Sequence, residues 1–236
     1  MEKSYRAIVY FFIAVFIFVF FGFFRSYFGL FPSFIGITPS LHLHAFLMLT
    51  WVGLLVAQPI LITKKKMRTH RYLGYLSYGL VPVIICVLLL MYRNQYYRLE
   101  HEISHEENLA ILFLPSTDIV PFMIFYILAI VNRKNTAKHM RYMICTAIVI
   151  LSAGLFRIIM ILFKPEFFTG FEITTVLLIL FFIGFLIYDT INKKPILSNP
   201  FLTANIIFGI PNVLFLILPK TMWWQSTAQT VVNFLL

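Results

Sequence analysis

Charged residues are scarce in this sequence, and their scarcity decides the class of the protein. Asp, Glu, Lys and Arg make up 12% of the 236 residues, whereas 61% are hydrophobic. A soluble domain carries about 25% charged residues, so a water-soluble fold is excluded. The sequence also lacks a P-loop, a G-x-G-x-x-G fingerprint and a G-x-S-x-G elbow. Nucleotide-driven pumps and serine hydrolases therefore have no support.

Cysteine is nearly absent as well, with only Cys86 and Cys145 in the chain. In the spans expected below, the depths of the two residues differ by roughly 15 Å at about 1.5 Å per helical residue. A disulfide requires Cα atoms within about 7 Å of each other. The sequence therefore predicts two free thiols inside the membrane.

Long apolar segments recur along the sequence. Each run of about 20 residues is long enough to cross a hydrocarbon core of roughly 30 Å, and backbone groups in lipid must bond within a helix. We therefore expect an all-α polytopic membrane helix bundle with about seven transmembrane helices, forming a single transmembrane domain over residues 1–236. The expected spans are residues 7–24, 41–62, 72–92, 108–131, 141–163, 171–190 and 201–218.

The second to fifth spans form two hairpins, and each hairpin closes on a basic turn that is followed by a histidine. This repetition favours a four-helix core over residues 41–163, with 7–24, 171–190 and 201–218 as peripheral helices. The first span has no small-residue cleavage site, so we interpret it as an anchor and not as a removed signal peptide. Trp223 and Trp224 in the tail are typical of an interfacial anchor.

Lys and Arg are distributed unevenly between the two sides of these spans. With the N-terminus inside, thirteen of them lie on the inside and five on the outside, and this bias predicts that orientation. The net charge of +10 then reflects topology and anionic lipid, and we expect no nucleic-acid partner. The inside residues are Lys3, Arg6, Lys64, Lys65, Lys66, Arg68, Arg71, Arg133, Lys134, Lys138, Arg141, Lys193 and Lys194, and the outside residues are Arg25, Arg93, Arg98, Lys164 and Lys220.

Two charges lie well inside the spans, where charge is costly and marks function. Asp118 is about 14 Å and Arg157 about 9 Å below the outer edge, and an ion pair could neutralise both. His44 lies at the same level, with Gln58 almost four turns below it. These four residues predict a polar pocket in the outer half of the bundle. Alternatively, the two charges only hold two helices together, and His44 bonds to water or a headgroup.

His70 and His139 begin outward-running helices after the two basic turns. Two facing imidazoles at one depth could ligate a haem iron, and ordinary interfacial hydrogen bonding is the alternative. Arg71 and Arg141 are explained as structural or lipid-facing basic residues by the positive-inside rule.

The outside loop holds His101, Glu102 and His105 in an H-E-x-x-H pattern. On a helix, the two histidines would share a face and could bind zinc or copper, with Glu102 as general base. Because the loop is rich in His and Glu, a chance match is the alternative.

The stretches "HAFLMLTWVGLLVAQPILI", "HRYLGYL" and "KHMRYM", with the intervening mid-helix Asp and the later Arg, resemble a family of bacterial membrane proteins classed as a domain of unknown function. That family has an H-R-x-L-G signature and a downstream H-x-R-x-M or H-x-x-W-M signature. The resemblance covers about residues 41–160 and implies a bacterial inner (cytoplasmic) membrane. The matching positions are His44, Gln58, His70, Arg71, Gly74, Asp118, His139, Arg141 and Arg157.

The layout is also similar to that of membrane b-type dihaem cytochromes, in which histidines on four consecutive helices hold two haems. Here the fourth span has Asp118 and no histidine, so the resemblance implies at most one bis-histidine haem b, on His70 and His139. The outer pocket would then suit a quinol, a second cofactor or a proton route.

Three functional hypotheses follow. The first is a haem b electron-transfer protein with a quinol or other redox partner. The second is a non-enzymatic accessory subunit of a larger membrane complex, or a small-solute carrier. The third is a metal-dependent membrane hydrolase. The sequence does not decide whether the protein is an enzyme.

Overall fold

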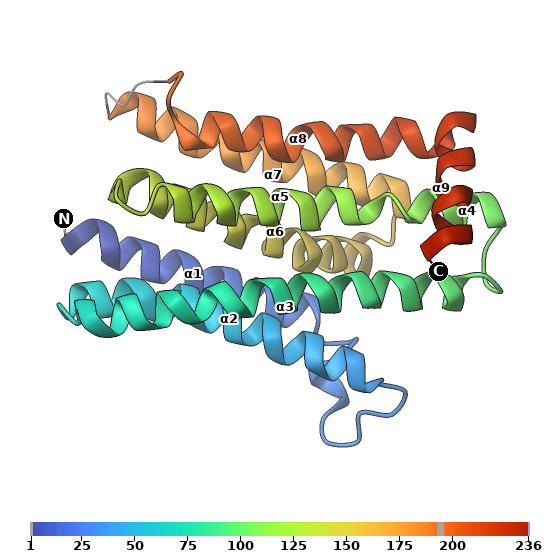
Figure 1. Cartoon of the computed structure of the whole chain (residues 1–236), viewed down its shortest axis with the longest axis horizontal. Coiled ribbons are helices and arrows are strands. Elements are labelled where there is room, and N and C mark those ends of the chain that lie inside the picture. The colour runs from blue at the N-terminus through green and yellow to red at the C-terminus, as the bar shows by residue number, and fades with distance from the viewer. Residues whose placement is uncertain (1, 193–195, 236) are drawn as a thin grey trace. The chain divides into compact units, whose positions relative to one another are not determined.

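The computed structural model describes residues 2–192 and 196–235, and every regular element in these ranges is helical. The elements are shown in Figure 1. They are α1 (Glu2–Gly22), η1 (Phe28–Leu30), α2 (Pro39–Thr63), α3 (Met67–Leu99), α4 (His105–Ile111), α5 (Leu114–Val131), α6 (Thr136–Phe163), α7 (Phe167–Ile191), α8 (Pro200–Ile217), η2 (Leu218–Lys220) and α9 (Met222–Leu235).

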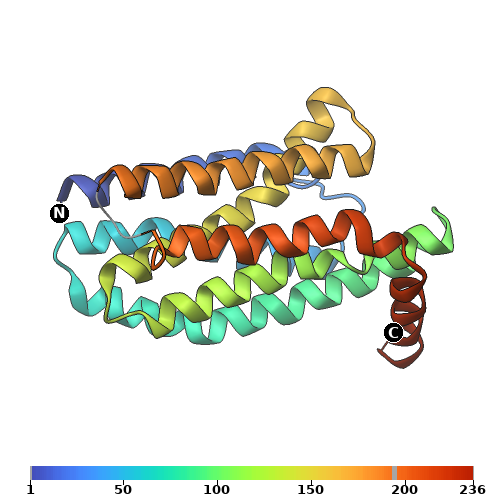
Figure 2. The ribbon, with the colours of Figure 1, turned by 90° about the horizontal axis from the view of Figure 1, so that it is seen from above.

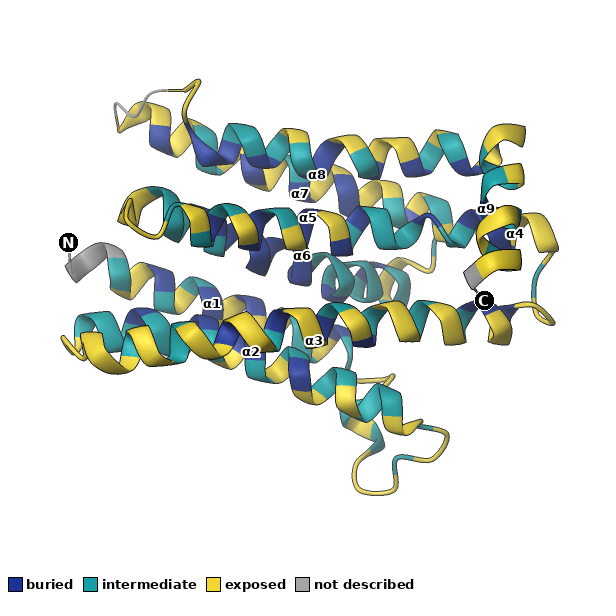
Figure 3. Ribbon diagram, in the orientation of Figure 1, coloured by how far each residue is buried: buried dark blue, intermediate teal, exposed yellow. Residues whose placement is uncertain are grey.

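Seven helical segments of the described chain are long and apolar enough to cross a membrane. α4 and α5 together form one of these spans, and α8 with η2 forms another. All seven coincide with spans expected from the sequence, so the prediction of an all-α polytopic bundle is confirmed, and the chain is an integral multi-pass membrane protein. Exposed residues recur along these helices (Figure 3). Many of them are large and apolar, as expected of surfaces that face lipid.

The chain forms two compact units. Unit 1 comprises residues 1–91 and 153–158, and unit 2 comprises residues 92–152 and 159–236. Unit 1 therefore contains α1, α2 and most of α3, while unit 2 contains α4, α5, α7, α8, α9 and most of α6.

Helix starts follow ordinary capping chemistry. The Thr38 hydroxyl accepts the Leu41 N–H at α2, and the Asn135 side chain accepts the Lys138 N–H at α6. Ser104 and Glu107 form a reciprocal capping box that starts α4. Such caps satisfy amide groups that the first turn leaves without partners.

In unit 1, α1 packs against α2, and buried side chains such as Phe12 and Trp51 lie on these two helices. Two glycines allow the segment 153–158 of α6 to approach α1 closely. A Cβ on Gly22 would overlap the backbone of Gly154, and a Cβ on Gly154 would lie 3.0 Å from the Val19 Cα. Only glycine fits where two helix backbones approach this closely.

In unit 2, α8 packs against both α5 and α7. Phe125, Phe182, Phe208 and Phe215 are almost completely buried there, and Phe182 contacts the rings of Phe125 and Phe208. The spans expected to be peripheral at 171–190 and 201–218 therefore share a buried core with α5.

The tail forms α9, which runs across the direction of α8 and packs against α4 (Figures 1 and 2). Its Trp224 indole donates a hydrogen bond to the Leu109 carbonyl over 2.9 Å. Trp223 on the same helix is exposed. A crosswise helix with one partly buried and one exposed tryptophan fits the interfacial role predicted for the tail.

Candidate functional site

His70 is the fourth residue of α3, and its backbone is tied to the preceding helix. The Gln58 side chain donates to the His70 carbonyl over 3.2 Å, while Gln58 Oε1 is buried and has no hydrogen-bond partner among the described residues. Gln58 therefore supports the turn that carries His70.

His139 is the fourth residue of α6, and its ring faces the end of α5. Its Nδ1 lies 2.8 Å from the carbonyl oxygen of Ala129, which is one of the last residues of α5 and is completely buried. Because a carbonyl can only accept, Nδ1 carries the hydrogen. His139 thus caps a helix end whose carbonyls lack partners within the helix. In the neutral ring, the lone pair is then on Nε2.

Two residues after His139, Arg141 forms a bidentate ion pair with Asp189 near the end of α7. Its Nε and its terminal Nη2 donate to the two carboxylate oxygens, each over 2.6 Å, and only 13% and 6% of the two side chains are exposed. Asn199 also donates to Asp189, over 3.0 Å, while its side-chain oxygen accepts the Phe201 N–H at the start of α8. The network joins α6, α7 and α8.

Arg141 was expected to be structural or lipid-facing, and the structure gives it a structural role. The sequence analysis did not identify Asp189 or Asn199. Asp189 carried a usable signal, since it is an acidic residue at the edge of a span and therefore needs a cation. Arg71, by contrast, is exposed, and its Nε donates only to the Met67 carbonyl one turn earlier, over 3.4 Å.

In unit 1 lie His44 and Arg157, two of the four residues predicted to form a polar pocket. The positive charge of Arg157 acts on the His44 imidazole, and the guanidinium also lies 4.0 Å from the centroid of the Phe23 ring. His42 has a separate environment, because its Nδ1 lies 2.8 Å from the Tyr27 hydroxyl. The two histidines therefore lie in different surroundings, as a spacing of two helical residues requires.

Asp118 belongs to unit 2, where its carboxylate accepts two short hydrogen bonds. The Tyr92 hydroxyl donates to Oδ2 and the Ile119 N–H donates to Oδ1, each over 2.6 Å. Tyr92 is a polar contact that the sequence analysis missed. Of the four predicted pocket residues, the structure brings together His44 and Arg157, places Gln58 at the turn of His70, and gives Asp118 a partner from α3.

A second polar cluster lies beside Asp118 and was also missed. Pro121 has no N–H, so the Thr117 carbonyl loses its usual partner within α5. Asn212 of α8 donates to that carbonyl over 3.2 Å and to the Phe208 carbonyl over 2.8 Å. Asn212 is buried, so it supplies the donor that a proline inside a membrane helix requires.

The H-E-x-x-H pattern does not lie on one helix. His101 and Glu102 are in the turn that follows α3, and His105 is the first residue of α4. Glu102 lies 3.5 Å from Arg98, and His105 Nε2 lies 2.6 Å from Gln229 Oε1 of α9. The shared helix face that a zinc site of this type needs is therefore lacking at 101–105.

Within residues 2–192 and 196–235, no three His, Cys, Asp or Glu side chains gather as a metal ion would require. Cys86 and Cys145 are both free, as predicted. No protein-family model, curated protein or solved structure matches this chain.

Proposed function

We propose that this membrane protein binds a haem b through His139 and transfers electrons to or from a quinol or another redox partner. One observation carries the proposal, namely the hydrogen bond of His139 Nδ1 to the Ala129 carbonyl. Metal-ligating histidines commonly donate their second ring nitrogen to a carbonyl, which fixes the tautomer and the ring orientation. His139 Nε2 is then the nitrogen that can bind iron.

His70, which the sequence predicts as a second ligand, is the fourth residue of α3 and lies in unit 1, whereas His139 is the fourth residue of α6 and lies in unit 2. A neutral imidazole would suit a b-type haem, which would supply an iron that carries one electron. The residues of the chain would bind and orient the haem. Ala129 fixes the ring of His139, Gln58 supports the backbone of His70, and the Arg141–Asp189 pair holds the start of α6 against α7.

The competing interpretation is that His139 is only a cap on the end of α5. A visible spectrum of protein purified from haem-replete cells separates the two interpretations. The haem proposal predicts a Soret band that shifts on reduction with dithionite. It also predicts that His139→Ala abolishes the band, while a matched histidine variant, His105→Ala, retains it. Wild-type protein without a Soret band would overturn the proposal.

A second candidate function is a small-solute or proton carrier, and the Tyr92–Asp118 pair is the observation that favours it. A carboxylate inside a membrane helix marks transport routes in many proteins. Proton flux into vesicles that contain a pH dye tests this candidate. Flux that is lost in Asp118→Asn and kept in Tyr92→Phe supports it, whereas equal flux in empty vesicles removes it. The version of the metal-dependent hydrolase that uses His101, Glu102 and His105 loses its support, because these residues do not share a helix.

A further inference from the structure

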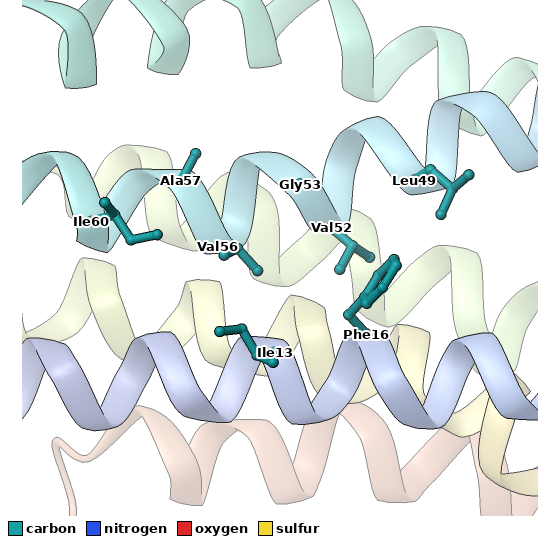
Figure 4. Close-up of a pocket in the computed structure, with 8 residues that line it drawn as sticks. All are labelled: Ile13, Phe16, Leu49, Val52, Gly53, Val56, Ala57 and Ile60. Carbon is teal, nitrogen blue, oxygen red and sulfur yellow. The ribbon is translucent and has the colours of Figure 1, made fainter.

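A groove of about 350 Å³ runs between α1 and α2 in unit 1 (Figure 4). All of the side chains that line it are apolar, and Gly53 widens it because a Cβ there would meet no atom within 4 Å. Because the groove lies along two helices that can span a membrane and its lining is apolar, a hydrocarbon chain fits it. The lining residues include Ile13, Phe16, Leu49, Val56 and Ile60.

The groove has the length of one lipid chain. On α2 it extends from Leu49 to Ile60, which corresponds to about 16 Å at about 1.5 Å per residue. The hydrocarbon of one leaflet is roughly 15 Å thick, half of the roughly 30 Å core. Ile60 lies three residues before the end of α2 at Thr63. The groove therefore occupies the half of the membrane next to the turn between α2 and α3.

That turn is cationic and has few acidic neighbours. Lys64, Lys65 and Lys66 are all exposed, and Arg6 is exposed near the start of α1, at the same end of the α1–α2 pair (Figure 1). Glu2 is the only acidic residue in the sequence of unit 1. The positive charge at the mouth of the groove therefore exceeds what acidic residues of the same unit can balance.

The geometry points to a binding site for an anionic glycerophospholipid, with an acyl chain in the groove and the phosphate at Lys64–Lys66. A chain gains little hydrophobic energy by leaving the bilayer for an apolar groove, so the lysines must provide the selectivity. A lysine near an anionic surface contributes an attraction equivalent to roughly fivefold in affinity. The test of this site does not depend on haem.

Native mass spectrometry of the full chain provides the test, after exposure to equal amounts of phosphatidylglycerol and phosphatidylcholine. Lys64→Gln/Lys66→Gln removes two positive charges that would face the lipid headgroup. Lys65 is left unchanged because it has a positive φ of 56°. Gly53→Leu/Ala57→Leu enlarges two of the residues that line the groove. Lys134→Gln/Lys138→Gln removes the same charge from the turn between α5 and α6 and from the first turn of α6, and it serves as the matched control.

The wild-type protein should retain one phosphatidylglycerol, enriched at least about tenfold over phosphatidylcholine, since two lysines contribute roughly fivefold each. The Lys64/Lys66 variant should lose that preference, the groove variant should lose the bound lipid, and the control should match the wild type. If the groove variant does not fold, the comparison of the two lysine variants decides. Equal retention of both lipids, equal loss in the control, or retention of an isoprenoid in place of phospholipid would overturn the site.

Discussion

The ion pair between Arg141 and Asp189 gives the sharpest prediction about stability. In Asp189→Leu, the guanidinium of Arg141 would lose both of its 2.6 Å bonds to the carboxylate while only 13% of its side chain is exposed. Removing one partner of a buried pair costs about 3–5 kcal/mol. Because Arg141 lies in the second turn of α6, it can still reach towards water, and we expect a cost of about 3 kcal/mol.

Replacing both partners by apolar residues should be far less harmful. The double variant Arg141→Met/Asp189→Leu leaves no unpaired charge, and such exchanges are often neutral or stabilising. We expect the free energy of unfolding of the double variant to lie within about 1 kcal/mol of that of the wild type. The two sites would then be coupled by at least about 2 kcal/mol, which is within the range measured for residues in one network.

Cys145 provides a built-in reporter for this measurement. Its thiol is free, completely buried and one helical turn beyond Arg141, so a thiol-reactive fluorophore labels it only on unfolding. The exposed Cys86 is first replaced by serine. At about 2–4 °C per kcal/mol, Asp189→Leu should lower the melting temperature by roughly 6–12 °C. The exposed Arg68→Met serves as the control and should change stability by less than about 0.5 kcal/mol. A double variant as unstable as Asp189→Leu would refute the reasoning.

Three further predictions use the same thermal assay or limited proteolysis. Gly154→Ala should cost about 1–3 kcal/mol, because its Cβ forces α1 away, and an unchanged melting temperature would contradict this close approach. Asn212→Leu should cost about 1–2 kcal/mol by leaving the Thr117 carbonyl without its donor; Asn212→Gln should recover part of that loss if the hydrogen bond is the cause. Trp224→Phe removes the donor to the Leu109 carbonyl and should cost about 1 kcal/mol, and α9 should be released faster by protease than in Trp223→Phe.

The membrane spans could be predicted from the sequence because hydropathy is a local property. Even so, α3 extends over Met67–Leu99, well beyond the expected 72–92. Its ends are rich in Arg, Asn and Tyr, and their low hydropathy is typical of loops. Such residues can nevertheless continue a helix once it leaves the hydrocarbon. Hydropathy therefore located the part of the helix in lipid and not the ends of the helix.

The polar contacts were harder to predict because they join residues far apart in the chain. Asp189 lies 48 residues from Arg141, and Asn212 lies 95 residues from Thr117. No periodicity reveals such pairs. What a sequence can show is the need for a partner, because a proline inside a membrane helix frees a carbonyl. Pro121 thus predicts that Thr117 needs a donor, while the packing of α5 against α8 decides which residue supplies it.

Haem binding at His139 is the central claim, and a pyridine haemochromogen assay on purified protein tests it most directly. The account predicts about one haem b per chain in the wild type and in His105→Ala, and none in His139→Ala. The His139→Ala protein should still show a cooperative Cys145 labelling transition, because one cap hydrogen bond contributes only about 1 kcal/mol. A folded His139→Ala protein that keeps its haem, or a wild type that contains none, would contradict the account.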